Sequence, residues 1–206
     1  MSRAELKARA KDMLRGNWGT AIAVMLVQAV IMGLGSRLGP PLAQSQVEGI
    51  HVEARANLLM LVISGALSVG ICGVYLSFLR EGKAEFSQMF DGFTECFVAS
   101  LIANLVMGFA VGLGCVLLLI PGIVLSLMFS QTFFILRDHP DLSGIDAMMA
   151  SKDMMAGHKG EYFVLMLSFI PWFMLCVFVL PIFYVVPYFT ATMTAYYDQL
   201  SAENQF

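Results

Sequence analysis

Charged residues are scarce in this sequence: 12 lysines and arginines and 15 aspartates and glutamates make up 13% of its 206 residues. Soluble domains are about 25% charged, whereas 58% of this chain is hydrophobic and its mean hydropathy is +0.76. The composition therefore predicts an integral membrane protein. The net charge of −3 gives no excess of basic residues for nucleic acid, so no nucleic-acid partner is expected.

Cysteine and histidine are also scarce, and this excludes several kinds of site. The four cysteines, Cys72, Cys96, Cys115 and Cys176, are scattered in or beside apolar runs, so we expect reduced thiols rather than a zinc site or a disulfide framework. The three histidines and all the charged residues lie outside the apolar runs. The sequence therefore predicts no catalytic residues, no metal site and no cofactor, and hence a protein that is not an enzyme.

What the chain does contain is a series of apolar runs, and a helix needs about 20 apolar residues to cross a membrane. Residues 96–136 carry no charge and are too long for one crossing, so Pro121-Gly122 is interpreted as a turn, with Gly112 and Gly114 as the alternative. The first run follows a basic segment, but Arg37 and nearby prolines favour a retained span over a signal peptide. The predicted fold is all-α and polytopic, a single membrane domain over residues 1–206. Six transmembrane helices are expected at about 18–35, 58–79, 96–120, 122–136, 162–180 and 182–197.

The distribution of basic residues predicts the orientation, because cytoplasmic loops of membrane proteins are enriched in lysine and arginine. With six spans, the external loops hold only Arg37 and Arg55. The other ten basic residues then fall on the cytoplasmic side: Arg3, Lys7, Arg9, Lys11, Arg15, Arg80, Lys83, Arg137, Lys152 and Lys159. We therefore expect a multi-pass protein with both termini in the cytoplasm.

Short amphipathic helices should precede three of the spans on the cytoplasmic side. They are expected as interfacial helices at about 3–15, 85–93 and 143–157. Each ends with methionine, a large apolar residue, any residue and then a glycine, namely Gly16, Gly92 or Gly157. The repetition predicts three related units, each an amphipathic helix followed by a transmembrane hairpin.

The third of these helices contains the run "MMASKDMMAGHK", whose methionines beside His158 could form a soft-metal site. The methionine at 154 recurs in all three units, two of which lack the histidine, so we interpret the run as an apolar helix face instead. Ser143 should cap this helix with Asp146, and Gly157 should end it in a left-handed conformation. The residues expected on its apolar face are Ile145, Met148, Met149, Lys152 and Met155.

Several of these runs resemble the DUF975 family of bacterial integral membrane proteins. The most specific likenesses are "GNWG", "IPGI", "SKDMMAG", the spacing of Asp138, Pro140 and Ser143, and the "PY" at 187–188. The resemblance extends over nearly the whole chain except residues 36–57. In these runs and in the repeat, the structural motif positions are Gly16, Trp18, Gly19, Gly92, Pro121, Gly122, Gly157 and Pro187.

The resemblance implies a six-span fold in the bacterial cytoplasmic (inner) membrane, and it implies no catalytic residues. The family is more distantly similar to the membrane domains of some glycerophosphodiester phosphodiesterases, but this chain has no such catalytic domain. The chain departs from the family pattern at Pro171, where glycine is usual, and in its methionine-rich helix.

Two groups of polar residues are candidate sites. Arg3, Lys7, Lys11 and Arg15 follow one another at helical spacing and could contact lipid headgroups, although they could equally just orient the first span. Gln28, Asn104 and Gln131 are the strongest polar groups inside the spans, where they could line a path or bond between helices.

A third group of polar residues could suggest hydrolysis: Asp138, His139 and Asp141 beside Ser143. The segment "DHPDLS" is better interpreted as a turn that begins a helix.

The leading hypothesis is therefore a non-enzymatic membrane module that binds membrane lipids, a membrane-protein partner or a second copy of itself. The alternatives are a small uncoupled transporter or channel and, after it, a membrane-embedded enzyme.

Overall fold

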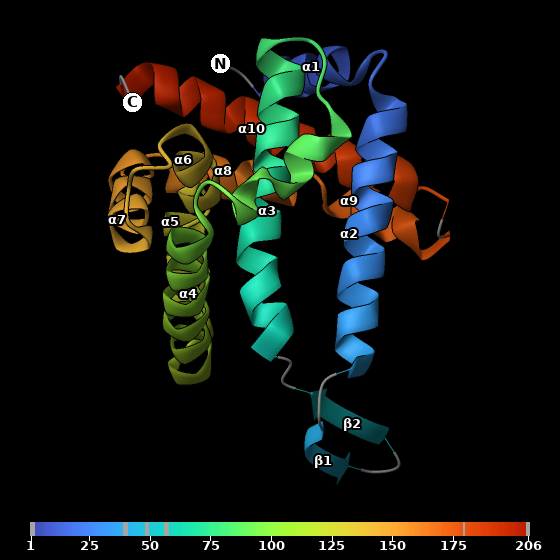
Figure 1. Cartoon of the computed structure of the whole chain (residues 1–206), viewed down its shortest axis with the longest axis vertical. Coiled ribbons are helices and arrows are strands. Elements are labelled where there is room, and N and C mark those ends of the chain that lie inside the picture. The colour runs from blue at the N-terminus through green and yellow to red at the C-terminus, as the bar shows by residue number, and fades with distance from the viewer. Residues whose placement is uncertain (1–2, 39–40, 48–49, 56–57, 179, 205–206) are drawn as a thin grey trace.

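The computed structural model describes residues 3–38, 41–47, 50–55, 58–178 and 180–204. Three long helices, α2 (Trp18–Leu38), α3 (Leu58–Arg80) and α4 (Phe97–Leu117), run along the long axis of the molecule (Figure 1). α1 (Arg3–Leu14) and the C-terminal part of α10 (Ile182–Asn204) lie at one end, and both ends of the chain are found there. The two chain ends therefore share one side of the fold.

A β-hairpin lies at the opposite end of the molecule, between α2 and α3 (Figure 1). Its strands, β1 (Pro41–Val47) and β2 (Ile50–Arg55), pair antiparallel. The sequence predicts only a connection between two spans here, so the hairpin adds two short strands to a fold that is helical as predicted. Elsewhere in the described part of the chain, all regular secondary structure is helical.

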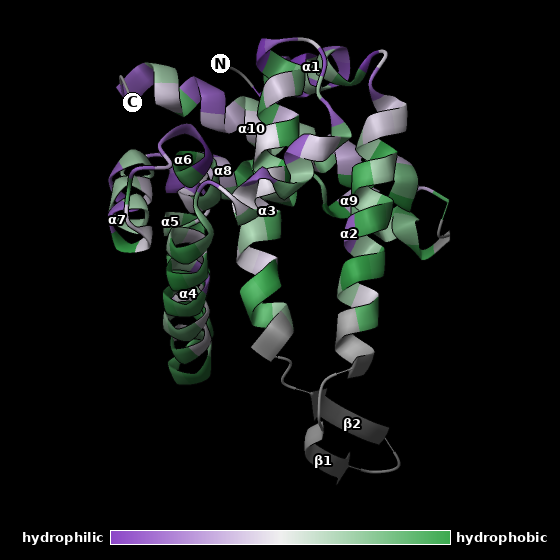
Figure 2. Ribbon diagram, in the orientation of Figure 1, coloured by the Kyte–Doolittle hydropathy of each residue, from purple (hydrophilic) through white to green (hydrophobic). Residues whose placement is uncertain are grey.

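Three helical segments are long and apolar enough to cross a membrane: Met60–Arg80, Phe97–Leu117 and Leu119–Asp138, the last comprising α5 (Leu119–Met128) and α6 (Thr132–Asp138). A fourth is present if α1 and α2 count as one bent segment. Figure 2 shows hydrophobic residues along α4 and α5 and hydrophilic residues concentrated at the end that holds the chain ends. The structure is thus that of a helical protein with three or four candidate spans, and the six-span count stays a prediction.

α1 and α2 meet at an angle of 94°. Gly16 lies at the bend with φ +84°, a left-handed conformation that L-residues with side chains seldom adopt. The residues predicted on one face of α1, including Leu6, Ala10 and Leu14, are all buried. They pack against α10 rather than facing lipid, because α10 passes directly beneath α1 (Figure 1).

The hairpin of the third and fourth predicted spans turns at Leu118 and not at Pro121-Gly122. Pro121 lies in the first turn of α5, where the missing N–H of proline has no intrahelical partner to lose. Gly122 packs against α4, and a Cβ there would lie 2.7 Å from the backbone nitrogen of Cys115. These two residues therefore start α5 and bring it close to α4, instead of forming the turn.

The predicted fifth span, residues 162–180, is not one helix. It is divided into α8 (Lys159–Leu167), α9 (Ile170–Leu175) and the 3₁₀ helix η2 (Cys176–Phe178). Pro171 explains the first break, because its ring would collide with the carbonyl four residues earlier, at Leu167, where α8 ends. The predicted sixth span is longer than expected, since α10 continues to Asn204 with Pro187 inside it.

The methionine-rich helix, α7 (Gly144–Met154), buries one face in the core and leaves the other face exposed. Its buried face packs against α4 and α6, and a Cβ on Gly144 would lie 2.8 Å from the Ala103 nitrogen. Met148 and Met155 are buried as well, whereas Met149 is exposed, so the predicted single apolar face is divided. Gly144 allows the close approach to α4, whereas the Ser151 hydroxyl donates to the Met128 carbonyl of α5 at 2.8 Å. The small buried residues of α7 were not part of the predicted stripe. They are Gly144, Ala147 and Ser151.

The three predicted repeat units differ in structure. Gly16 and Gly157 share the left-handed conformation, with φ +84° and +85°, and Ser143 accepts a hydrogen bond from the Asp146 backbone nitrogen as expected of a cap. The second unit is instead a 3₁₀ helix, η1 (Phe86–Phe93), in which Gly92 allows close packing on Ala66 of α3. The three-unit repeat stays a prediction.

Ion pairs join the helices at the end of the molecule that holds the chain ends. Both guanidinium amino groups of Arg80 on α3 donate to the carboxylate of Asp138 on α6, each at 2.8 Å. The Tyr197 hydroxyl donates to the same carboxylate at 2.9 Å, and Arg9 on α1 pairs with Asp198 at 2.8 Å. The network therefore fixes α1, α3, α6 and α10 to one another at this end.

Candidate lipid-binding site

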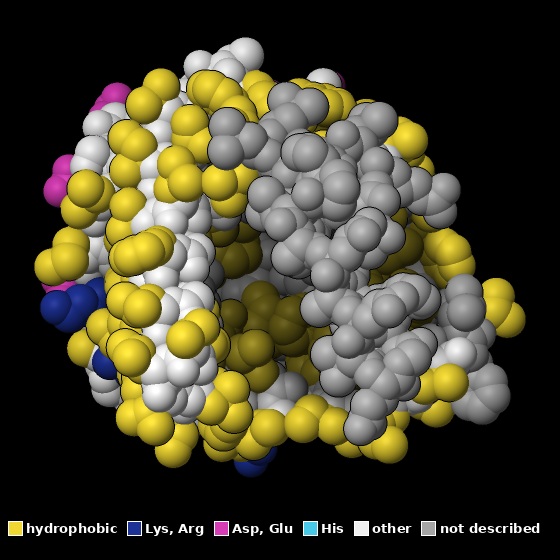
Figure 3. Space-filling view, turned by 90° about the horizontal axis from the view of Figure 1, so that it is seen from below, with side chains coloured by type: hydrophobic (Ala, Val, Ile, Leu, Met, Phe, Trp, Pro, Cys, Tyr) yellow, Lys and Arg dark blue, Asp and Glu magenta, His cyan; other side chains and the backbone are white. Residues whose placement is uncertain are grey.

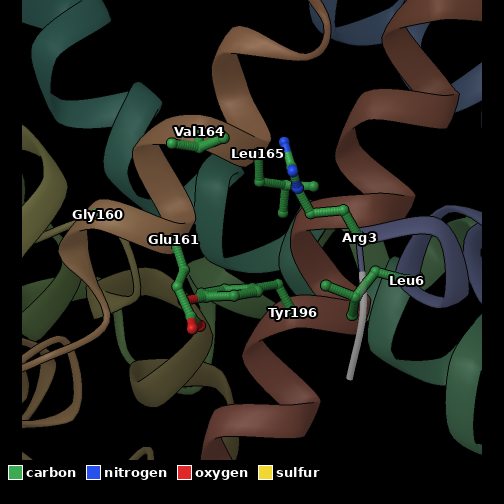
Figure 4. A pocket seen from close by; sticks show the side chains of 7 residues that line it. All are labelled: Arg3, Leu6, Gly160, Glu161, Val164, Leu165 and Tyr196. Carbon is green, nitrogen blue, oxygen red and sulfur yellow. The ribbon is translucent and has the colours of Figure 1, made fainter.

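A cavity of about 460 Å³ lies between α1, α8 and α10, and we call it the α1–α8–α10 pocket. Figure 4 shows the seven residues that line it. Its size is in the range of roughly 300–1,000 Å³ that small-molecule sites occupy. The lining residues are Arg3, Leu6, Gly160, Glu161, Val164, Leu165 and Tyr196.

The polar groups of this pocket come from all three helices. The Arg3 side chain extends from α1 toward Leu165, and the Glu161 carboxylate lies beside the Tyr196 ring (Figure 4). Within the described chain Arg3 and Glu161 are not paired with each other; the nearest ionisable partner of Glu161 is His158, whose Nδ1 lies 3.8 Å from Oε2. One cation and one carboxylate thus share the cavity without neutralising each other.

The walls of the pocket are held by contacts outside it. Arg9 pairs with Asp198 and so fixes α1 to α10, while the Tyr196 hydroxyl donates to the His158 carbonyl at 3.2 Å. The rings of Tyr162 and Tyr196 lie 5.2 Å apart, which fixes α8 against α10. The pocket is therefore a rigid feature of the helix packing.

On its other side, α8 forms an apolar groove with α5, which we call the α5–α8 groove. It consists of two adjoining cavities of about 350 and 380 Å³ that share Ile123, Leu127 and Phe163. Lys159 and Gly160 lie at one end of the groove, and Gly160 also lines the α1–α8–α10 pocket. The remaining residues of the groove are Ile120, Val124, Ser126, Met166, Leu167, Ile170, Phe173 and Phe189.

Of the four basic residues predicted to contact lipid headgroups, only Arg3 lines the pocket. The Lys7 ammonium donates to the Ser168 carbonyl at 3.4 Å and lies 4.3 Å from the centre of the Phe169 ring. Burial, together with repulsion from Arg3 and Lys11, lowers the Lys7 pKa. Lys7 therefore faces the protein, and its role is in packing.

The other two basic residues do not line the pocket either. The Lys11 ammonium lies 5.6 Å from the centre of the Tyr188 ring on α10. Arg15 pairs with Asp12 at 3.3 Å, and both side chains are largely exposed. The helical spacing of the four residues thus does not bring them to one site.

The three predicted intramembrane polar residues do not converge on one path. The Asn104 amide donates to the Leu61 carbonyl at 2.9 Å and to the Ser64 hydroxyl at 2.8 Å, so it joins α4 to α3. Gln131 is fully buried between α5 and α6, and its amide donates to Ser130 at 3.0 Å. Gln28 lies half-buried on α2. The Gln131 amide also donates to the Met155 sulfur, beyond α7, at 3.9 Å, so Asn104 and Gln131 each contact another part of the fold, but at separate places.

Asp138 is engaged in the ion-pair network and accepts from Arg80 and Tyr197, which fits the predicted turn better than a hydrolytic site. Among the described residues, no group of three His, Cys, Asp or Glu side chains is placed to hold a metal ion. The backbone carbonyl of His158 accepts a hydrogen bond from the Tyr196 hydroxyl, and Met154 is buried in the core. Met148 and Met155 of the same segment are buried as well.

The family model described as "Protein of unknown function (DUF975)" matches residues 1–126 and 115–204. The chain belongs to the DUF975 family. No curated protein and no solved structure matches this DUF975 protein. The family assignment agrees with the resemblance in the sequence, but it does not assign an activity to the pocket.

Glu161 and Tyr196 of this DUF975 protein were not predicted as site residues. A signal was present, because Glu161 precedes Tyr162, Tyr196 precedes Tyr197, and tyrosine is enriched at membrane interfaces. What the sequence does not reveal is that residues 3, 161 and 196 meet, since this depends on α1 crossing over α10.

Proposed function

We propose that this protein is a non-enzymatic, multi-pass module of the bacterial cytoplasmic membrane that binds a phospholipid in the α1–α8–α10 pocket. The observation that supports it best is the composition of the pocket, where a guanidinium and a carboxylate that are not paired with each other stand beside apolar walls. A phospholipid has the same division into a charged headgroup and apolar chains. A pocket at the charged end of an apolar helical bundle lies at the depth of lipid headgroups.

The proposed orientation has both termini in the cytoplasm and follows from the ten basic residues predicted on that side. We also propose that α8, α9 and α10 contribute the fifth and sixth membrane segments, with the first of them broken at Pro171. Met174, Val177 and Leu180 are 71–81% exposed, and such side chains are stable next to hydrocarbon but not in water.

The experiment is native mass spectrometry of the protein released from mild detergent. Phospholipid adducts are expected on the wild type, and Arg3→Gln should lower their retention about fivefold, since one basic residue at a membrane surface contributes about 1 kcal/mol. The matched control is Arg15→Gln, which removes the same charge just after the end of the same helix and away from the pocket.

Absence of phospholipid from the wild type would overturn the proposed function. An equal loss in Arg3→Gln and Arg15→Gln would overturn the assignment to the pocket, because it would reflect the overall charge of α1.

A small uncoupled transporter is the second candidate, and one cavity favours it. About 300 Å³ lies between α4 and the α5–α6 region, lined by Asn104, Ser126 and Ser130 among apolar residues. Flux of a solute through proteoliposomes that is lost in Asn104→Leu would support this function in place of lipid binding. The hydroxyls of Ser126 and Ser130 already donate to carbonyls of their own helix, so the cavity offers few unused donors.

A further inference from the structure

We propose that the ligand is a glycerophospholipid with a zwitterionic headgroup bearing a primary ammonium, and that one of its acyl chains crosses α8 at Gly160 into the α5–α8 groove. This inference rests on the proposed lipid-binding function and specifies the ligand of the same site.

The charges of the pocket match those of a zwitterion. Arg3 presents a guanidinium suited to a phosphate diester, and Glu161 presents a carboxylate suited to an ammonium group. Lys159, at the mouth of the groove, and the N-terminus of α8, which begins at Lys159, add positive potential beside Gly160. The phosphate therefore fits against Arg3, and the ammonium fits toward Glu161.

An ammonium on the headgroup would give a cationic partner to the Glu161 carboxylate, whose side chain is 73% exposed and open to a ligand. The only ion-pair partner of Glu161 within the described chain is His158, at 3.8 Å, a distance too long for a hydrogen bond. A quaternary ammonium would hold its charge at a distance behind methyl groups and could not donate to the carboxylate. A primary ammonium, which has three donors, is thus the favoured chemistry.

Gly160 is the residue that makes the crossing possible. It lines both the α1–α8–α10 pocket and the α5–α8 groove, it is exposed, and a Cβ built on it would meet no other atom within 4 Å. The space above its backbone is open, so a chain can pass from one side of α8 to the other there. The α8 residues that flank this passage carry side chains.

The groove beyond Gly160 suits a hydrocarbon chain. Its lining is apolar almost throughout, and its one hydroxyl, on Ser126, donates to the Ile123 carbonyl at 2.8 Å. Phe163 lies where the two cavities of the groove adjoin, and its side chain is 39% exposed. An acyl chain placed here would cover apolar surface without burying an unsatisfied polar group.

The test measures lipid retention by native mass spectrometry after exchange into nanodiscs of equal parts phosphatidylethanolamine, phosphatidylglycerol and phosphatidylcholine. The wild type should retain phosphatidylethanolamine preferentially. Glu161→Gln should reduce this preference about two- to fivefold, the range expected of an exposed charge pair. Gly160→Leu should lower total retention about tenfold or more. The leucine side chain would occupy the space above α8 through which the acyl chain passes, and the acyl chain would lose the burial of several methylene groups.

The matched control is Gly112→Leu. Gly112 is an exposed helical glycine whose Cβ would also meet nothing within 4 Å, and it lines neither cavity. It should retain lipid as the wild type does. Neither leucine should destabilise the fold, because leucine favours a helix over glycine.

Wild-type retention by Gly160→Leu would overturn the acyl route. Equal or greater retention of phosphatidylglycerol by the wild type, with retention still lost in Arg3→Gln, would overturn the ammonium assignment while leaving the proposed lipid binding intact. Absence of any lipid that depends on Arg3 would instead overturn the proposed function itself.

Discussion

Gly65→Ala should destabilise the protein, because Gly65 is where α3 approaches α4 most closely in the membrane region. A Cβ on Gly65 would lie 2.6 Å from the Ser100 carbonyl oxygen and 3.2 Å from the Asn104 Cβ. Ordinary contacts begin at 3.4 Å, so the helices must separate by about 0.8 Å for a contact of normal van der Waals length. That displacement also strains the two hydrogen bonds from the Asn104 amide to α3, at 2.9 and 2.8 Å.

The magnitude follows from three contributions. Overpacking costs about 1–3 kcal/mol, weakening the two hydrogen bonds within the membrane costs about 1 kcal/mol, and the helix propensity of alanine returns about 1 kcal/mol. The free energy of unfolding should therefore fall by about 2 kcal/mol, which lowers the melting temperature by roughly 4–8 °C in a chain of this size.

The measurement is thermal unfolding in detergent, followed by the fluorescence of the two tryptophans. The control is Gly112→Ala on α4, where a Cβ meets nothing within 4 Å, so only the propensity gain of up to about 1 kcal/mol remains. The two variants should shift the melting temperature in opposite directions. If Gly65→Ala melts at or above the wild-type temperature, α3 and α4 do not pack as described.

Three further predictions concern the cap, the ion-pair network and the topology. Ser143→Ala should remove the N-cap of α7 and cost about 1 kcal/mol, seen as a melting temperature lower by roughly 2–4 °C; no change would mean that the cap is unimportant. Asp138→Asn should weaken the bidentate pair with Arg80 and cost about 1–3 kcal/mol, with lipid retention unchanged because Asp138 lies outside the pocket. With the C-terminus in the cytoplasm, a fluorescent-protein fusion after residue 204 should be bright and a phosphatase fusion at the same position should be inactive. The reverse result would place the C-terminal end of α10 on the external side.

The sequence predicts elements best where apolar runs are bounded by glycine or by charge. α2 and α3 lie close to the predicted 18–35 and 58–79, and Gly16 and Gly157 adopt the conformation expected of helix ends. These features depend on neighbouring residues only, so a local pattern is sufficient to find them.

Prolines caused the largest differences between the predicted and the observed helices, because the effect of a proline depends on its position within a helix. Pro121 was interpreted as a turn but begins α5, while Pro171 was placed inside a span and instead separates α8 from α9. Both prolines lie in the first turn of a helix, where the missing N–H costs no intrahelical hydrogen bond. Each of these two prolines therefore begins a new helix rather than forming a turn or continuing a span.

The candidate site was predicted in part, through Arg3. Lys7 and Lys11 occupy the same predicted face, but α1 turns this face onto the aromatic rings of Phe169 and Tyr188. Glu161 enters the site from the other half of the chain. Local patterns identify charged residues near a membrane, and the packing of distant helices decides which of them share a cavity.

The bend at Gly16 has a consequence for the order in which the protein is assembled. Because α1 lies across α10, the pocket requires residues 3, 161 and 196 together, and the contact between Arg9 and Asp198 closes a loop of most of the chain. A chain synthesised from its N-terminus therefore exposes α1 long before the partner helix exists. The pocket is complete only when α10 has been made and docked, so a lipid held there marks a fully assembled protein.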